Sequence, residues 1–327
     1  MKIVMYQYAE RGYRLWAMAD YERIIYLNYA YENLLAAMKE PRYQALAAAI
    51  VPDDSVAFLA GGKRSWEGAT AALDAAKGNR CPDLGASGRR FVFERKEVKL
   101  GAPVQNPLRI ICLSHNYHDF IRETGVPLPP APRIFSKYNN ALCGPDDPII
   151  YPKMSKMLCY EAELAFVIGK RGRHVTKERA LEYIGGYMIL NDVSASDLTE
   201  LDKQVLRGKT FDNFAPCGPF LLSADELPDP GNLEMKLWVN DRELQTSNTR
   251  ELVYDCPTLV AFLSEVFTLE PGDIVATGTP GGLAKFRKPP TFMQVGDVCA
   301  IEIEKLGRLT NQIVAEEETA RSPGVKI

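Results

Sequence analysis

The chain has 327 residues, of which 46% are hydrophobic and 25% are charged, and its formal net charge is −3. This length allows a sizeable core and predicts two domains, while the composition is ordinary for a globular protein. No basic stretch is interleaved with aromatic residues and polar residues interrupt every apolar run near the N-terminus, so we expect no nucleic acid partner, no signal peptide and no membrane span.

The cysteines indicate a reducing compartment. Seven of them are scattered along the chain without a CxxC pair, at positions 81, 112, 143, 159, 217, 256 and 299. Such usage is typical of free thiols, so the sequence predicts a cytoplasmic protein without structural zinc.

Residues 1–100 are predicted to form a small N-terminal α+β domain. Two short segments near the start, at 1–8 and 13–20, have the pattern of a strand pair. The Ala/Leu spacing further on predicts helices at 31–50 and 65–78. A connector with proline and glycine at 98–108 leads into an apolar strand at 109–114. We place the domain boundary near residue 100.

Residues 101–327 have a different pattern, with many short strands and few helices. Strands are predicted at 162–169, 185–193, 233–240, 273–278 and 299–307. Helices are predicted at 176–185, after a Thr176 cap, and at 256–267, with Pro257 in the first turn. Because strands outnumber helices without βαβ alternation, we predict a mainly antiparallel β domain with peripheral helices. The charged segment 315–327 predicts a frayed end.

Two acids stand in the apolar segment "YEAELAFVIGK" at 160–170. Side chains two positions apart in a strand share one face, so the carboxylates of Glu161 and Glu163 should lie side by side. An exposed edge strand would tolerate this, but the unbroken apolar run from Leu164 to Ile168 indicates that both faces are covered. Covered carboxylates that close together need a cation or a shared proton.

A third acid follows another buried strand. Asp192 ends the apolar segment 185–193 and could face the two glutamates from a neighbouring strand. Three carboxylates form a hard oxygen site, which suits Mg²⁺, Mn²⁺ or Ca²⁺ rather than zinc. An Asn-Asp pair at a strand end is also a common turn signal, and spacing alone does not separate the two interpretations.

Three other segments carry polar groups with possible chemistry. Lys209 in "RGKTFDNFAPCGPF" could be a buried partner of an oxyanion or of the acids, or a surface lysine in a turn. The loop "GTPGG" at 278–282 could hold a carboxylate with its backbone N–H groups, or be a plain turn. The segment "SHNYHDFIRE" brings together His115, His118 and Glu123, which could transfer protons or form an ordinary charged helix face.

Taken together, these segments resemble the fumarylacetoacetate hydrolase family. The matching motifs, which span roughly residues 105 to 315, are "NYxDxxxE", "YExELAxVIGK", "GYxxxNDVSA", "GKxFDxFxPxGP", "VNxxxxQ", "GDIxxTGTPxG" and "GDxxxIxIxxxGxLxN". Seven motifs in this order make the resemblance specific.

The resemblance implies a β-roll of antiparallel sheets, usually dimeric, with a divalent cation at the acids that match Glu161, Glu163 and Asp192. The cation would be Mg²⁺, or else Mn²⁺ or Ca²⁺. It also implies that Lys209 acts in catalysis and that the substrate is a small oxo-acid, typically a 2-oxo acid, a 1,3-diketone or its enol. The residues predicted at the substrate are Tyr117, Ser196, Thr199, Gly278 and Thr279.

The sequence departs from the family pattern at three positions. Phe120 stands where the histidine that pairs with Glu123 is usual, Ser196 where an arginine is usual, and Thr199 where a glutamine is usual. We therefore predict Glu123 as the base, either alone or helped by His118 or His115. His118 ranks below Glu123 because it is off the i,i+4 spacing of a helix.

The predicted function is metal-dependent hydrolysis of a C–C bond in an acylpyruvate-like substrate through an enolate that the cation stabilises. The alternatives are a 2-oxo acid decarboxylase of the oxaloacetate type, an isomerase or hydratase, and a binding protein without catalysis. A homodimer through the β domain is expected, because a sheet-rich domain must cover its edges.

Overall fold

The computed structural model describes residues 1–7, 12–18, 20, 22–77 and 85–316. Its α-helices are α1 (Leu27–Ala37), α2 (Tyr43–Ile50), α3 (Ser55–Ala60), α4 (Gly62–Lys77), α5 (His118–Thr124), α6 (Ser196–Asp202), α7 (Leu206–Lys209) and α8 (Cys256–Val266). Its 3-10 helices are η2 (Arg95–Glu97), η3 (Asn139–Ala141), η4 (Lys177–Tyr183), η5 (Ala224–Glu226), η6 (Thr249–Glu251) and η7 (Ala284–Phe286). Cys81 and positions 317–327 of the predicted frayed segment lie outside the described residues.

The larger sheet runs through the whole molecule. Its strands follow the order β4-β3-β2-β1-β14-β12-β11-β17-β6-β7, with β5 beside β1 and β8 beside β14. Their bounds are β1 (Lys2–Gln7), β2 (Tyr13–Met18), β3 (Arg23–Tyr26), β4 (Val92–Glu94), β5 (Leu100–Gly101), β6 (Ile110–Ser114), β7 (Arg133–Lys137), β8 (Leu142–Cys143), β11 (Ala162–Ile168), β12 (Ile184–Asn191), β14 (Ala215–Ser223) and β17 (Ile274–Ala276). Antiparallel pairs dominate it, although β17 and β6 are parallel.

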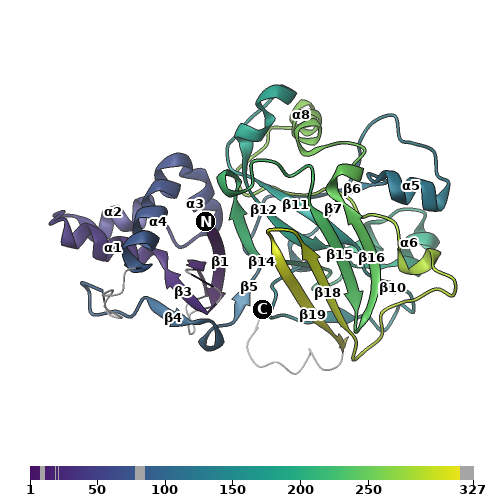
Figure 1. Ribbon diagram of the computed structural model, residues 1–327, viewed down its shortest axis with the longest axis horizontal. Helices are drawn as coiled ribbons and strands as arrows, with labels where there is room; N and C mark the ends of the chain where they lie inside the picture. The colour runs from purple at the N-terminus through teal and green to yellow at the C-terminus, as the bar shows by residue number, and fades with distance from the viewer. Residues whose placement is uncertain (8–11, 19, 21, 78–84, 317–327) are drawn as a thin grey trace.

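A second sheet of five strands packs on the first. Its order is β16-β15-β18-β19-β9, and a separate short pair joins β10 to β13. The bounds are β9 (Ile149–Tyr151), β10 (Leu158–Cys159), β13 (Ser194–Ala195), β15 (Glu234–Val239), β16 (Arg242–Asn248), β18 (Val298–Ile303) and β19 (Gly307–Ala315). In Figure 1 the strands β15, β18 and β19 lie across β11, β12 and β14, and β11 contacts β15 while β12 contacts β18. The main core fills the space between the two sheets, and every residue of β11 is buried.

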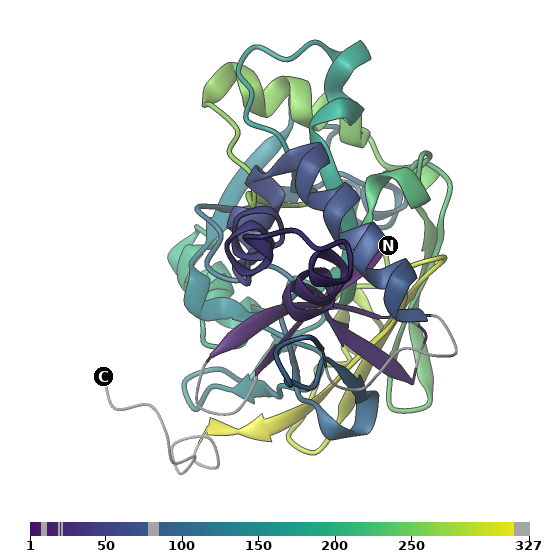
Figure 2. The same cartoon turned by 90° about the vertical axis from the view of Figure 1, so that its left-hand side faces the viewer.

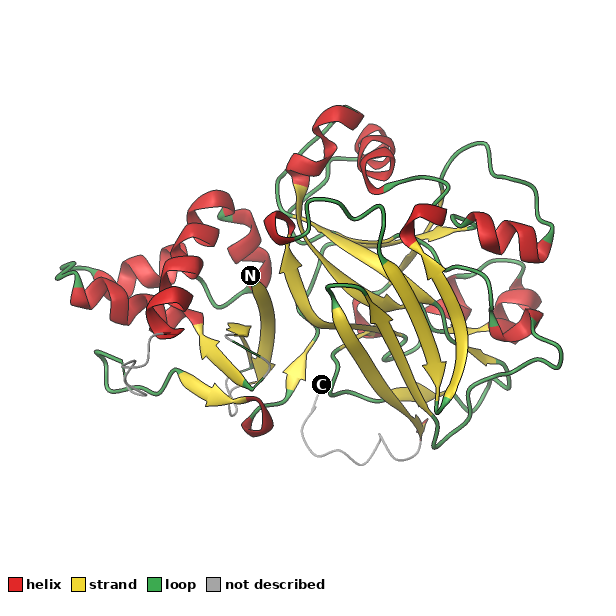
Figure 3. Ribbon diagram, viewed as in Figure 1, coloured by secondary structure: helices red, strands yellow, loops and turns green. Residues whose placement is uncertain are grey.

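The N-terminal hundred residues extend the larger sheet at one edge. Lys2 and Ile3 of β1 pair with Leu222 and Leu221 of β14, so the sheet continues across the predicted domain boundary. Helices α1 to α4 gather on one side of this extension, at the left of Figure 3 and toward the viewer in Figure 2. The division of the chain near residue 100 stays a prediction.

Most predicted elements are confirmed, and the differences have local causes. The predicted strand pair is β1 and β2, which are antiparallel. The predicted helix at 31–50 is two helices, because Pro41 cannot donate a backbone hydrogen bond and interrupts them. The predicted helix at 176–185 is the 3-10 helix η4, and the Thr176 side chain makes no capping hydrogen bond there.

Two helices start where their sequences provide a cap. The side chain of Asp54 accepts a hydrogen bond from the backbone of Ala57 in α3, and Asp255 accepts one from Thr258 in α8. Pro257 lies in the first turn of α8, as predicted. Within the described residues, no helix is long and apolar enough to span a bilayer.

Candidate active site

The three predicted acids meet at the ends of two neighbouring strands. In the register of β11 and β12, Ala162 lies opposite Asn191, which brings Asp192 beside Glu161. The backbone N–H of Asp192 donates to the carbonyl oxygen of Glu161 at 2.9 Å. One carboxylate oxygen from each of Glu161, Glu163 and Asp192 lies within 4.8 Å of the others. The same-face prediction for the two glutamates is thereby confirmed, and Asp192 joins them.

Two lysines neutralise part of this acid cluster. Lys209, in α7, donates to Oε2 of Glu161 at 2.7 Å and to Oδ2 of Asp192 at 2.6 Å. Lys137, at the end of β7, donates to Oδ1 of Asp192 at 2.6 Å and to the carbonyl oxygen of Val193 at 3.0 Å. Both lysines are buried, so Lys209 is a buried partner of the acids and not a surface lysine in a turn.

The pKa values of the acids differ because the lysines reach them unequally. Burial raises the pKa of Asp192, but Lys137 and Lys209 more than reverse this and hold it below its ordinary value. Burial raises the pKa of Glu163 well above its ordinary value, and the charges of Asp192 and Glu161 add to the rise. Burial by itself would lower the pKa of Lys209. The carboxylates of Asp192 and Glu161 outweigh burial and raise this pKa above its ordinary value, so the ammonium stays charged.

Glu163 shows that the cluster suits a cation. Its Oε2 accepts the backbone N–H of Gly278 at 2.8 Å, whereas Oε1 is buried without a hydrogen-bond partner. A buried carboxylate oxygen without a donor is costly and is readily explained by an ion. Three carboxylates, with no histidine or cysteine among them, fit a hard divalent cation such as Mg²⁺ or Mn²⁺.

The glycine-rich loop at 278–282 binds carboxylates of the protein itself. Gly278 has a φ of +98°, which favours glycine, and its N–H points at Glu163. The N–H of Gly282 donates to Oε2 of Glu123 at 2.7 Å, and that of Gly281 donates to Oδ1 of Asp119 at 3.2 Å. The loop therefore ties both ends of α5 to the acid cluster.

Gln245 links this loop to β11. Its Nε2 donates to Oγ1 of Thr279 at 3.0 Å and to the carbonyl oxygen of Pro280 at 3.0 Å, while its Oε1 accepts the N–H of Ala162. Gln245 is buried in β16, so the second sheet fixes the position of Thr279. The glutamine belongs to a matched motif, but no role for it was predicted from that motif.

A cavity of about 310 Å³ opens beside the cluster, a volume at the lower end of the range for small-molecule sites. Its polar lining consists of Ser114, His115, Cys159, Glu161, Ser194, Ser196, Thr199, Lys209, Thr279 and Lys285. Its apolar lining consists of Leu113, Phe120, Val126, Phe135, Val205, Leu283 and Phe286. One end of the cavity thus has the charged cluster, and the aromatic part of its wall also carries Lys285 and His115.

The predicted substrate residues divide into those that reach the cavity and those that do not. Ser196, Thr199 and Thr279 line it, and Oγ of Ser196 lies 2.9 Å from Sγ of Cys159. Gly278 contacts the cluster through its backbone. Tyr117 does not line the cavity, because its side chain is fully buried and its hydroxyl donates to the sulfur of Met235.

The predicted proton-transfer residues lie in three different places. Glu123 is exposed at the end of α5, where it accepts the N–H of Gly282. His118 is exposed at the start of α5 and is absent from the cavity lining. His115 does line the cavity, where its ring stacks on Phe120 with centroids 5.3 Å apart. The structure therefore favours His115 over His118 as the histidine nearest the site.

Lys137 is another residue of the site that the sequence did not indicate. The segment "RIFSK" has charged residues at both ends and its first four residues are not buried, so nothing local marks its last residue as buried. Only the pairing of β7 with β6, at the edge of the sheet next to β17 and β11, carries Lys137 to the cluster. The register of distant strands decides this contact.

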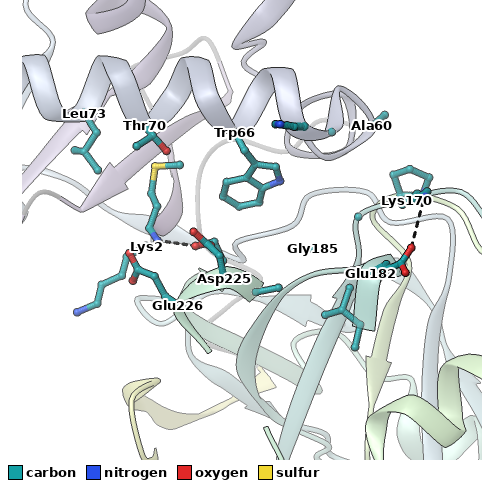
Figure 4. Close-up of a pocket in the computed structure, with 18 of the residues that line it drawn as sticks. Lys2, Ala60, Trp66, Thr70, Leu73, Lys170, Glu182, Gly185, Asp225 and Glu226 are labelled. Atoms are coloured by element: carbon teal, nitrogen blue, oxygen red, sulfur yellow. Dashed lines mark hydrogen bonds and ion pairs between the residues drawn. The ribbon is translucent and has the colours of Figure 1, made fainter. Parts of the chain in front are cut away.

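A larger cleft of about 1090 Å³ lies between α4 and the β domain. Trp66 and Thr70 of α4 face Glu182 and Gly185 across it in Figure 4. Its charged residues form ordinary pairs at the surface, such as Lys170 with Glu182 at 4.0 Å. Its paired side chains are largely exposed, and the buried ammonium of Met1 is satisfied by Glu226 and Ser223, so the cleft shows no arrangement for chemistry.

Comparison with known proteins agrees with this geometry. Residues 109–314 match the family model for the fumarylacetoacetate hydrolase C-terminal domain. "Oxaloacetate tautomerase fahd2, mitochondrial" of Xenopus laevis is 41% identical over 259 residues, 79% of this chain and 77% of the relative. Human "Oxaloacetate tautomerase FAHD2A, mitochondrial" is 42% identical over 225 residues, 68% of this chain and 72% of the relative.

Solved structures share the fold over nearly the whole chain. Fumarylacetoacetate hydrolase from Exiguobacterium antarcticum has a TM-score of 0.75 at 29% identity, covering 97% of this chain and 100% of that one. Maleylpyruvate hydrolase from Sphingobium sp. SYK-6, in complex with manganese(II) and pyruvate, has a TM-score of 0.70 at 30% identity, covering 96% and 99%.

Fold and site together define an α+β enzyme class with a carboxylate cluster at the strand ends of a β-roll. The chain belongs to the fumarylacetoacetate hydrolase family. The predicted family and fold class are thereby confirmed.

Proposed function

We propose that the protein is a divalent-metal-dependent enzyme that catalyses keto–enol tautomerisation of a small 2-oxo acid of the oxaloacetate type. The cavity next to the acid cluster supports this proposal, because the charged cluster at one end is combined with an aromatic wall in which Phe120 stands where the histidine that pairs with Glu123 is usual. The relatives from Xenopus laevis and human are named oxaloacetate tautomerases. This proposal replaces C–C hydrolysis as the first choice.

Glu161, Glu163 and Asp192 would hold the cation. When bound, the cation supplies Lewis-acid stabilisation of the negative charge that develops on the 2-oxo oxygen. Lys209 adds a fixed positive charge on the cavity side of the cluster, and Lys137 holds Asp192 from behind. Thr279 lines the cavity, and the hydrogen bond from Gln245 fixes its hydroxyl, which we expect to contact the substrate.

We assign proton transfer at C3 of the substrate to Glu123. Its carboxylate accepts the N–H of Gly282 in the loop that carries Thr279. Glu123 does not line the cavity in this structure, so the assignment requires its side chain to leave Gly282 and turn toward Thr279. One carboxylate suffices for tautomerisation, since the same proton is moved between carbon and oxygen. Hydrolysis also needs an activated water, and Phe120 offers that water no hydrogen bond.

The test is a direct comparison of substrates. The enol form of oxaloacetate is followed by its ultraviolet absorbance with Mg²⁺, with Mn²⁺ and with a chelator, and acylpyruvate cleavage is measured under the same conditions. We expect metal-dependent conversion of the enol to the keto form that far exceeds acylpyruvate cleavage. The reverse ranking would restore the hydrolase, and release of CO₂ from oxaloacetate at the same rate would indicate the decarboxylase.

We also propose a homodimer formed through the β domain. The five-stranded sheet has β16 and β9 at its edges, and such edges are normally covered. Light scattering at micromolar concentration should give about twice the chain mass of 36.5 kDa.

The cytoplasmic location predicted from the cysteines is a proposal as well, and the names of the two animal relatives include the word mitochondrial. Fractionation of cells that express the tagged chain decides between the compartments.

A further inference from the structure

Lys285 is a cation on the cavity wall that the acid cluster does not use. It belongs to η7, and its ammonium lies 5.0 Å from the ring centroid of Phe286. Its ion pair with Glu200 spans 3.6 Å, and the Glu200 side chain is 57% exposed. Because exposed pairs of this kind contribute little, the charge of Lys285 stays available to a ligand.

His115 offers a hydrogen-bond donor on the same cavity wall. Its Nδ1 lies 3.3 Å from a guanidinium nitrogen of Arg133. A guanidinium can only donate, so Nδ1 accepts and the proton of the neutral ring is on Nε2. Burial lowers the pKa of His115, and the charges of Arg133 and Lys285 lower it further, so the ring is neutral at pH 7 with Nε2–H as its donor.

Lys285 and His115 share the aromatic part of the cavity wall. The His115 ring stacks on Phe120, whose ring centroid lies 6.0 Å from that of Phe286, and Lys285 lies over the Phe286 ring. The lysines among the cavity-lining residues are Lys209 and Lys285, and Lys209 is held by the acids, so Lys285 is the lysine that can meet a ligand at this wall.

The charges in and beside the cavity suit a dianion. The cluster has three carboxylates and two ammonium groups, so a bound divalent cation leaves it with one positive charge. The 2-oxo carboxylate end of a ligand would neutralise that charge. Lys285 supplies a second positive charge. A monocarboxylate would leave it with the exposed Glu200 as its partner, whereas a second carboxylate on the ligand could pair with it inside the cavity.

We propose that Lys285 and His115 form the subsite for the far carboxylate of a dicarboxylic 2-oxo acid, whose other end lies at the acid cluster. The inference rests on the proposed function and deepens it by naming the substrate class. The two residues act in specificity and binding, and they are separate from the groups that handle the proton at C3.

The test measures binding of two inert probes by calorimetry in the presence of Mg²⁺. Oxalate can occupy only the cluster end, whereas N-oxalylglycine carries the same chelating end and a second carboxylate. We expect Lys285→Gln to weaken N-oxalylglycine binding at least about ten-fold and to leave oxalate binding unchanged. Lys285→Arg should keep most of the affinity, and His115→Phe should weaken only the longer probe.

Lys63→Gln is the matched control, because Lys63 is 88% exposed on α4 and far from the cavity in the fold. Equal weakening of both probes by Lys285→Gln, or no weakening of either, overturns the subsite. If the probes behave as expected but oxaloacetate is not turned over, the subsite stands and the proposed tautomerase activity fails. If oxaloacetate is turned over with an unchanged KM in Lys285→Gln, the activity stands and the subsite fails.

Discussion

The molecule has two hollows, a larger cleft and a smaller cavity, and they differ in whether their charged side chains are exposed to solvent or buried. The larger cleft beside α4 has acids and lysines that stay in contact with solvent and form separate pairs. The smaller cavity has its charges buried at one end, where Lys209 contacts two carboxylates and Asp192 contacts two lysines. The size of a hollow therefore does not identify the site of chemistry here. The site is identified by buried charges that share partners, because water cannot screen such charges.

The largest expected effect concerns Lys137. Replacing it with Met removes one partner of the buried Asp192 and should lower the free energy of unfolding by about 3 kcal/mol. Urea unfolding in the presence of a chelator measures this. Lys170→Met in the larger cleft is the control and should change stability by less than about 0.5 kcal/mol, since its pair is exposed. Equal effects would remove the distinction between the two hollows.

The next effect concerns metal binding. Glu163→Gln keeps an oxygen for the N–H of Gly278 but loses the negative charge. We expect Mn²⁺ binding to weaken at least about 100-fold, the upper end of what substitutions around metal ligands cost. Calorimetry measures it, with Glu182→Gln from the larger cleft as the charge-matched control. Unchanged binding in Glu163→Gln would show that the cluster is not the metal site.

A kinetic effect of similar size is expected at Glu123. Glu123→Gln can still accept the N–H of Gly282, so the fold should be kept while turnover of oxaloacetate falls at least about 100-fold. Metal binding should be unchanged. His118→Ala should change turnover little, because His118 is exposed outside the cavity. Full activity in Glu123→Gln would place proton transfer on another group.

The smallest effect concerns a carboxylate outside both hollows. Partial burial raises the pKa of Asp255, but hydrogen bonds from Thr258 and the charge of Lys177 outweigh this and lower it. Asp255→Ala should cost about 1 kcal/mol at pH 7 as a lost helix cap. Because the folded-state pKa is depressed, this contribution is present above the ordinary carboxylate pKa and is lost as the pH falls through the folded value. Unfolding measured against pH should show the two proteins converging in acid.

Much of the site could be predicted from local sequence. The i,i+2 spacing of Glu161 and Glu163 in an apolar strand was enough to place both carboxylates on one face, since a strand has a period of two. The order of the motifs along the chain indicated the family, and the family pattern in turn predicted Asp192 and Lys209 as residues of the site. The same pattern misplaced Tyr117, because a motif does not tell which way a buried side chain points.

What the sequence alone determined is the glutamate pair on one strand face, the strand-rich pattern after residue 100 and the family. The first two depend on neighbours within a few positions, and the family depends on the order of the motifs along the chain. Only the tertiary structure decided that Lys137 joins the acids, that Gln245 fixes Thr279, and that His115 and Lys285 share a cavity wall. These contacts join segments more than 30 residues apart in the chain. Their partners are set by strand pairing and sheet packing, which no local pattern encodes.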